Sequence, residues 1–255
     1  MRLAGKVALV TGASRGYGRA IAQRLARDGA FVAVHYAAND EAAKATVASI
    51  ETAGGGALLL KTPLDGSAAS AKALFDRLDM ELTKLGKPNT VDILVNNAAI
   101  SPRGTIESTG ETVFDEVFAV NAKAPFFLVQ NAISRMPDGG RIINISSQTS
   151  LIAFPDVAAY SMAKGALDLL TKVAARHLAE RNITVNAVLP GVADTDMNAS
   201  WLRGNPESRA AAAKFSAFNR IADVTDIADI VAFLASGDAR WITGQLIDGG
   251  GGSRL

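Results

Sequence analysis

Residues 6–35, KVALVTGASRGYGRAIAQRLARDGAFVAVH, decide the fold of this chain. The stretch opens with a short apolar run and continues through a loop that contains Gly12, Gly16 and Gly18. A helical spacing of apolar residues follows, and a second apolar run closes the stretch. Strand, glycine-rich loop, helix and strand, in this order, form the unit that holds a dinucleotide pyrophosphate at a helix N-terminus.

Apolar runs alternate with helical patterns along the rest of the chain. Strands are expected at residues 6–10, 31–35, 57–61, 91–95, 141–145, 184–189 and 245–248, and helices at 19–28, 41–53, 67–85, 112–135, 158–180 and 226–236. This alternation predicts an α/β fold, a Rossmann-type doubly wound parallel sheet of about seven strands with helices on both faces. Residues 1–255 are expected to form one NAD(P)-binding domain, with short helices at 196–218 as a substrate lid.

Composition bounds the classes of function that the chain can have. Hydrophobic residues make up 49%, which is enough for a sizeable core and excludes disorder as the main state. The 26 basic and 25 acidic residues nearly balance, which disfavours binding to nucleic acid or to an anionic membrane. Cysteine is absent, so disulfides and thiol catalysis are excluded, and with two histidines neither a metal site nor a Ser-His-Asp triad is expected.

The histidines and the ends of the chain carry few signals. His35 lies in an expected strand and should pack there, whereas His177 lies in an expected helix and should be solvated. No apolar run approaches the ~18 residues of a transmembrane helix. The first strand follows the N-terminus too closely for a signal peptide, so we expect a cytoplasmic protein.

A second informative stretch, SQTSLIAFPDVAAYSMAK, runs from Ser147 to Lys164. Tyr160 and Lys164 are four residues apart and share one face of a helix. A tyrosine has a pKa near ~10, and a neighbouring ammonium lowers this pKa, so that the phenol can exchange a proton at neutral pH. The Ser147 hydroxyl can stabilise charge on the same carbonyl oxygen. Taken alone, the spacing also fits a half-buried tyrosine and a solvated lysine.

The glycine loop has the spacing GxxxGxG, so the general GxGxxG fingerprint is not met as written. With the other motifs, however, the chain resembles the short-chain dehydrogenase/reductase family, in its compact single-domain branch, and is similar to 3-oxoacyl-ACP-reductase-like ketoreductases. The resemblance covers essentially the whole chain. It rests on TGxxxGxG at 11–18, NNAA at 96–99, Asn121, Ser147, YxxxK at 160–164, PG at 190–191 with Thr195, and a GQ…DGG-like ending at 244–250.

The resemblance implies roles for the matching residues. Tyr160 is the expected acid/base, Lys164 tunes its pKa and binds the cofactor ribose, and Ser147 positions the substrate carbonyl. Asn121 is expected to hold a water that links Lys164 to a proton relay. Without the family, Asn121 is an amide buried for helix packing. Asp65 is expected to hydrogen-bond adenine and is otherwise an ordinary loop carboxylate.

The resemblance also implies a cofactor site. Asn97 and Ala98 should lie along the ribose, and the backbone of Val192 and Ala193, with Thr195, should hold the nicotinamide carboxamide. The full expected set is Gly12, Ser14, Arg15, Gly16, Tyr17, Gly18, Tyr36, Ala37, Asn39, Asp65, Asn97, Ala98, Ala99, Tyr160, Lys164, Pro190, Gly191, Val192, Ala193 and Thr195.

The choice of cofactor can be argued from charge. An NAD site usually has a carboxylate at the end of the second strand, where it binds the ribose 2′-hydroxyl. Residues 35–37 (HYA) supply no acid, and Asp40 comes later, where we expect it to cap the next helix. Arg15 can pair with a 2′-phosphate, and Asn39 can add a hydrogen bond, so NADP(H) is expected rather than NAD(H). Arg15 is otherwise a solvated loop cation.

Three residues depart from the family pattern. Tyr17 stands where the family most often has isoleucine or another aliphatic residue, beside the nicotinamide, where it either reshapes the pocket or packs. Ala99 replaces a glycine and Ala193 a branched residue, and both changes leave the assignment intact.

The sequence describes the substrate only coarsely. The expected substrate residues are Ser147, Gln148, Phe154, Val157, Tyr160, Met197 and Trp201, together with Ile152 and, at the rim, Arg103. They indicate a mainly apolar pocket, although several also fit plain core or lid packing. Arg103 would suit an anionic or carrier-bound substrate.

The main hypothesis is therefore an NADPH-dependent reductase of a ketone or aldehyde, with a small-molecule substrate and no metal. The alternatives are an NAD(P)-dependent alcohol dehydrogenase with the same residues, and a cofactor-sensing protein without turnover. The second is disfavoured because all four matching catalytic residues are present. The family is commonly tetrameric, and the apolar stretches 125–129 and 241–247 are compatible with a homotetramer or homodimer.

Overall fold

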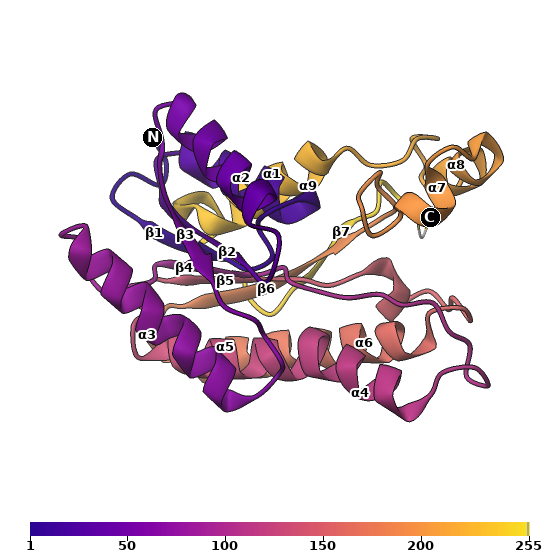
Figure 1. The fold of residues 1–255 in the computed structure, drawn as a ribbon, viewed down its shortest axis with the longest axis horizontal. Helices are drawn as coiled ribbons and strands as arrows, with labels where there is room; N and C mark the ends of the chain where they lie inside the picture. Colours follow the sequence, from indigo (N-terminus) through magenta and orange to yellow (C-terminus); the bar gives the residue numbers. More distant parts are fainter. Residues whose placement is uncertain (254) are drawn as a thin grey trace.

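The computed structural model describes residues 1–253 and 255. Within these residues, seven parallel strands form one sheet in the order β3-β2-β1-β4-β5-β6-β7 (Figure 1). The strands are β1 (Val7–Val10), β2 (Phe31–Tyr36), β3 (Gly56–Lys61), β4 (Ile93–Asn96), β5 (Arg141–Ile145), β6 (Thr184–Pro190) and β7 (Leu246–Gly249). The strand order reverses between β1 and β4, so the predicted doubly wound sheet is confirmed.

Helices cover both faces of the sheet. Figure 1 shows α1, α2 and α9 on one side and α3, α4, α5 and α6 on the other. Their bounds are α1 (Gly16–Arg27), α2 (Asp40–Thr52), α3 (Ala68–Lys84), α4 (Glu111–Phe118), α5 (Ala124–Ile133), α6 (Ala158–His177) and α9 (Val224–Ala235). Helical segments connect each strand to the next along the chain, as the alternating sequence pattern predicts.

Two apolar layers, one on each face of the sheet, make up most of the core. In β1, Ala8 and Val10 face the layer under α1 and α9, whereas Val7 and Leu9 face the layer under α3 and α5. Successive side chains of a strand point to opposite faces, and here both faces are buried. This explains why the strands are continuous apolar runs in the sequence rather than alternating ones.

The predicted helix at 112–135 is interrupted. It consists of α4, a π-helical turn (Ala119–Lys123) and α5. The α-helical partner of the Asn121 carbonyl would be the N–H of Pro125, and a proline has none. The missing donor explains why the helix widens at this point, and Asn121 lies inside the widened turn.

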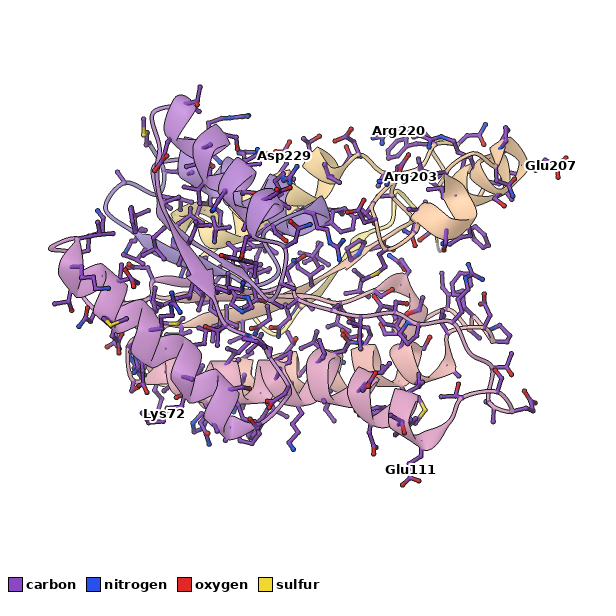
Figure 2. The ribbon with its side chains drawn as sticks, viewed as in Figure 1. Lys72, Glu111, Arg203, Glu207, Arg220 and Asp229 are labelled. Atoms are coloured by element: carbon purple, nitrogen blue, oxygen red, sulfur yellow. The ribbon has the colours of Figure 1, made fainter. Side chains whose placement is uncertain are left out.

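Residues 196–218 hold two short helices, α7 (Ala199–Leu202) and α8 (Pro206–Ala213), as predicted. Both lie at the end of the molecule where the chain terminates (Figure 1). Arg203, labelled in Figure 2, directly follows α7 and pairs with Asp194 and Asp196 at 2.7 Å and 3.0 Å. Arg209 also pairs with Asp194, at 2.9 Å, so ion pairs tie α7 and α8 to the segment that leaves β6.

Candidate active site

A cleft of about 1610 Å³ opens at the carboxyl ends of the strands, where the strand order reverses. Ligands of open α/β sheets bind at such switch points. The cleft brings together most of the residues expected from the sequence: Gly12, Ser14, Arg15, Gly16, Tyr17, Gly18, Tyr36, Ala37, Asn39, Asn97, Ala98, Ala99, Arg103, Ser147, Gln148, Ile152, Phe154, Val157, Tyr160, Lys164, Pro190, Gly191, Val192, Thr195, Met197 and Trp201.

Asp65 and Ala193 do not line this cleft. Asp65 is exposed and accepts a hydrogen bond from the Ser67 N–H at 2.8 Å, at the start of α3. Hydrogen bonds from the Ser67 and Ser70 side chains hold the pKa of Asp65 down to about 2. Ala193 is buried and forms a β-bridge with Ala222. Asp65 therefore lies at the N-terminus of α3, next to Leu64, which lines the cleft, and its contact with adenine stays a prediction.

The glycine loop forms a cradle of bare backbone. A Cβ on Gly18 would lie 2.2 Å from the Gly12 carbonyl oxygen and 2.5 Å from Asn97 Nδ2, so no side chain fits there. Gly12 has a φ of +63°, which favours glycine. Asn97 fastens the loop, because its Nδ2 donates to the carbonyls of Thr11 and Gly12 at 2.8 Å and 3.1 Å. The loop and the N-terminus of α1 therefore fit a pyrophosphate.

His35 accepts a hydrogen bond from the glycine loop, a role that no sequence pattern indicated. The Gly12 N–H donates to His35 Nδ1 at 3.2 Å, and Nε2 lies 2.7 Å from the Thr62 carbonyl oxygen, so Nε2 carries the proton. Burial lowers the pKa of His35 to about 4. The sequence predicted only that His35 packs in its strand. The only feature that could have pointed to a contact with the loop was the position of His35 near the end of β2.

Tyr160 and Lys164 lie on one face of α6, and Ser147 follows β5. Both α6 residues are buried, with Lys164 only 2% exposed. The Lys164 ammonium donates to the Ile145 carbonyl at 2.7 Å and lies 5.5 Å from the centre of the Tyr160 ring. The predicted helix and its shared face are thus confirmed, and the three side chains meet at one end of the cleft.

Burial dominates the electrostatics of this group. It raises the pKa of Tyr160 to about 12, although a hydrogen bond with Ser147 lowers the pKa in part. It also lowers the pKa of Lys164 to about 8, with the charge of Asp168 opposing the change. The net pKa of Tyr160 is therefore raised, and not lowered as its spacing from Lys164 led us to expect. The cost of burying a phenolate outweighs the ammonium, which bonds a backbone carbonyl, so Tyr160 keeps its proton at neutral pH.

Ser147 is arranged as a hydrogen-bond donor. Its Oγ accepts bonds from the Thr149 N–H at 3.2 Å and from Thr149 Oγ1 at 3.1 Å. Because Ser147 accepts these bonds, its own proton points away from Thr149, toward Tyr160 or toward a substrate carbonyl bound beside it. Thr149 also lines the cleft, and no pattern in the sequence pointed to it.

Asn121 is fully buried, and its side chain is already occupied. Its Oδ1 accepts from the Ile100 N–H at 2.9 Å, and its Nδ2 donates to the Ile100 carbonyl at 2.8 Å. The amide therefore ties the loop after β4 to the π-helical turn. The second N–H of the amide and the backbone carbonyl of Asn121, which Pro125 leaves without an α-helical donor, are the groups left to meet a water.

Arg15 and Asn39 line the part of the cleft beside β2. Arg15 is exposed there and lies 3.3 Å from Asp196. Asn39 caps α2 by accepting from the Ala42 N–H at 2.9 Å. The expectation that Asp40 caps this helix is wrong, because Asp40 is its first residue and pairs instead with Lys61.

Aromatic rings face one another at the other end. The Phe154 and Phe215 ring centres lie 5.6 Å apart, and both residues line the cleft. Trp201 stacks against the Arg103 guanidinium at 5.4 Å, and Arg103 also pairs with Asp156. No sequence pattern indicated Phe215, because this residue stands in a polar, alanine-rich segment.

Comparisons with known proteins agree with this geometry. A family model described as enoyl-(acyl carrier protein) reductase matches residues 12–253. Versicolorin reductase 1 of Aspergillus parasiticus is 37% identical over 262 residues, covering 99% of this chain and 97% of the relative. A solved structure of LugOII, a promiscuous reductase that catalyses keto-reduction in lugdunomycin biosynthesis, is 50% identical, with a TM-score of 0.95 and 100% of both chains covered.

The chain belongs to the short-chain dehydrogenase/reductase family. A further member, the angucycline C-6 ketoreductase LanV with bound NADP, is 50% identical, with a TM-score of 0.93 and 99% and 96% of the two chains covered. Among residues 1–253 and 255, no helix of this family member is long and apolar enough to cross a membrane. The same residues place no group of three or more His, Asp or Glu side chains for a metal ion.

Proposed function

We propose that this chain reduces a ketone or aldehyde to an alcohol with NADPH, and that Tyr160 donates the proton. The observation that carries the proposal is the buried Tyr160, beside Ser147 and Lys164, in a cleft that begins at a cradle of bare backbone. A protonated phenol suits reduction, which needs a proton donor, better than alcohol oxidation, which needs a base. The ketoreductases among the relatives support the same direction.

The residues of the cleft have separate proposed roles in cofactor binding and in proton transfer. The loop at Gly12–Gly18 and the N-terminus of α1 would hold the pyrophosphate, and Lys164 the ribose. When bound, the reduced nicotinamide supplies a hydride to the carbonyl carbon. Ser147 donates a hydrogen bond to the carbonyl oxygen, and Tyr160 gives that oxygen its proton. The Lys164 ammonium, with a pKa of about 8, stabilises the tyrosinate that forms.

Asn121 contributes as a positioning residue. Its amide holds the backbone of Ile100, which lines the cleft beside the family motif at 96–99. Its backbone carbonyl is the group that we propose to hold the water of a proton relay to Lys164. Proton return to Tyr160 would then follow Lys164 and that water.

The proton-donor assignment is tested by Tyr160→Phe. General acid catalysis typically contributes about 10²–10⁴-fold, so kcat should fall by that range while NADPH still binds. NADPH consumption can be followed by absorbance with a reducible ketone, and binding by NADPH fluorescence. Unchanged ketone reduction in Tyr160→Phe would remove Tyr160 from the reaction.

We further propose NADPH rather than NADH as the cofactor. Residues 35–37, at the end of β2, include no acid, and Arg15 lines the cleft near them. Arg15 can exchange its exposed pairing with Asp196 for a 2′-phosphate at little cost, because surface ion pairs contribute about 0–1 kcal/mol. NADP in the LanV structure is consistent with this choice. Arg15→Ala should weaken NADPH more than NADH, and equal weakening would remove the argument for a phosphate contact.

For the substrate, we propose a bulky, flat aromatic ketone. Phe154 and Trp201 line the cleft, and the segment 196–218, which we take to be a lid, adds the exposed rings of Phe215 and Phe218. Such surfaces suit stacking on fused rings. A panel of fused-ring ketones, quinones and β-keto thioesters, followed by NADPH absorbance, would test this, and preference for the thioesters would contradict it.

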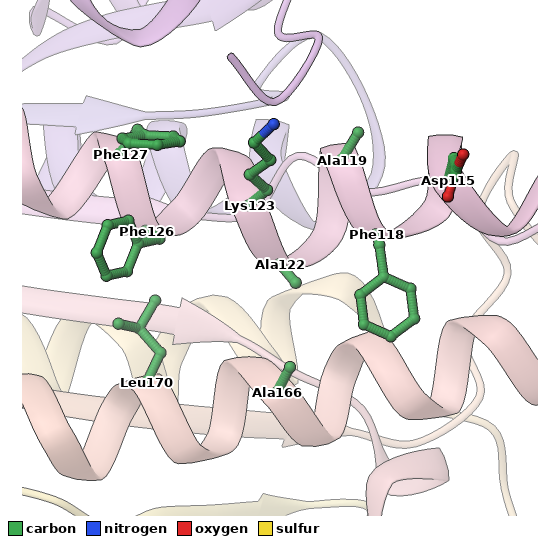
Figure 3. A pocket seen from close by; sticks show the side chains of 9 residues that line it. All are labelled: Asp115, Phe118, Ala119, Ala122, Lys123, Phe126, Phe127, Ala166 and Leu170. Atoms are coloured by element: carbon green, nitrogen blue, oxygen red, sulfur yellow. The ribbon is translucent and has the colours of Figure 1, made fainter. Parts of the chain in front are cut away.

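We also propose a homo-oligomer, a tetramer or dimer, working in the cytoplasm where NADPH is supplied. A groove of about 680 Å³ runs between the α4–α5 helix and α6 (Figure 3). Figure 3 shows Phe118, Ala122 and Phe126 pointing toward Ala166 and Leu170 across it. Phe126 is 50% exposed and Leu169, on α6, is 63% exposed. Large apolar side chains that are exposed in a single protomer are typical of a face that a second copy covers.

A further inference from the structure

Tyr17 is a large polar residue at the start of α1, and its hydroxyl makes a contact with another loop. It lies in the first turn of α1, and it packs against the core layer under α1 and α9 while also lining the cleft. Its hydroxyl donates to the Gly191 carbonyl oxygen at 3.2 Å. An aliphatic side chain could fill the same space but could not make this bond.

The bond joins two loops that approach the cleft from different strands. The glycine loop follows β1, and Gly191 follows β6, with β4 and β5 between the two strands. Because β2 lies on the opposite side of β1, the adenosine half of a dinucleotide cradled at the glycine loop faces β2. The other half must then reach toward β5 and β6, where Ser147 and Tyr160 stand. Gly191 therefore lies beside the half of the dinucleotide that carries the nicotinamide.

Hydrogen bonds hold the backbone of the Gly191–Val192 segment from several sides. The Gly191 N–H donates to the Gly249 carbonyl at 3.4 Å, and the Val192 carbonyl accepts from the Ala222 N–H at 2.8 Å. Between these two anchors, the Gly191 carbonyl is held by Tyr17. A peptide unit is planar, so fixing the Gly191 carbonyl also fixes the direction of the Val192 N–H.

We propose that Tyr17 is a positioning residue for the nicotinamide half of the cofactor, because its hydroxyl sets the orientation of the peptide between Gly191 and Val192. The inference rests on the proposed function, since it takes a nicotinamide dinucleotide to be the ligand of the cleft. Tyr17 makes this contact as a donor at all working pH values. Burial raises the pKa of Tyr17, and the charges of Tyr160, Asp226 and Asp223 raise it further.

The test compares two ligands in one variant. Tyr17→Phe removes the hydroxyl and keeps the ring, and binding is measured for NADPH and for 2′,5′-ADP, which has the adenosine half without nicotinamide. One lost hydrogen bond corresponds to about 2- to 10-fold in affinity. We expect NADPH to bind about 2- to 10-fold more weakly and 2′,5′-ADP to bind as it does to the wild type. Tyr17→Ile, which also lacks the donor, should show the same difference between the ligands.

Two results would overturn the inference. Equal weakening of both ligands would show that Tyr17 only supports the glycine loop, and unchanged NADPH binding would show that its hydroxyl positions nothing. The unfolding temperature of each variant identifies a loss caused by misfolding, and Tyr17→Ile then supplies the comparison if Tyr17→Phe is unstable. Only binding is measured, so a wild-type protein that binds NADPH but reduces no ketone contradicts the proposed reaction without deciding the role of Tyr17.

Discussion

His35 makes the stability of this protein depend on pH in a defined window. The imidazole is 2% exposed, and each ring nitrogen already has a backbone partner, Gly12 for Nδ1 and Thr62 for Nε2. A second proton on the ring would turn Nδ1 into a donor facing the Gly12 N–H, inside a buried site. The folded chain therefore resists protonation, whereas the unfolded chain does not.

The sign and size follow from the pKa. Burial lowers the pKa of His35 from 6.5 to about 4 in the folded protein. Above pH 6.5 the ring is neutral in both states, so its contribution is fully present. As the pH falls toward 4, only the unfolded chain gains the proton, and the folded state loses about 3 kcal/mol in total, at about 1.36 kcal/mol per pH unit. About 2 kcal/mol of this loss should be present at pH 5.

Urea unfolding at pH 7 and pH 5 measures the effect. Other groups also titrate, so the quantity to compare is the change in unfolding free energy between the two pH values in wild type, His35→Gln and His177→Gln. His177, the other histidine, is exposed on α6 and serves as the matched control. His35→Gln should lose about 2 kcal/mol less than the wild type on going to pH 5, and His177→Gln should match the wild type. The same pH dependence in all three proteins would refute this account of His35.

Three other predictions concern the loop, the lysine and the outer helices. Gly18→Ala should nearly abolish NADPH binding, because the new Cβ would lie 2.2 Å from the Gly12 carbonyl oxygen. Gly165→Ala, with open space around its Cβ, should leave NADPH binding intact. Fluorescence titration with NADPH compares the two variants. Reduction should decline as pH rises through about 8, where Lys164 loses its proton, and the slower Lys164→Arg, which stays charged, should lack this decline in a pH–rate profile. Phe126→Asp should shift the protein to smaller species in light scattering, whereas Lys72→Ala on the exposed face of α3 should not; an unchanged mass for Phe126→Asp would place the interface elsewhere.

Much of the fold follows from local patterns. The apolar runs and helical spacings predicted the order of strands and helices, because burial on both faces of a parallel sheet leaves its mark along each segment. The spacing of Tyr160 and Lys164 likewise determined that they share a face of α6. Even the break in the helix at Asn121 has a local cause in Pro125, although the pattern over residues 112–135 concealed it.

The sequence by itself therefore determined which elements form, their order, and the residues that reach the carboxyl end of the sheet. Only the tertiary structure decided that burial raises the pKa of Tyr160, that His35 supports the glycine loop, and that Tyr17 holds Gly191. Periodicity and spacing are properties of neighbours along the chain, so they can be seen in the sequence. Burial and hydrogen bonds between distant segments depend on which surfaces meet when the helices pack against the sheet. No local pattern in the sequence contains that information.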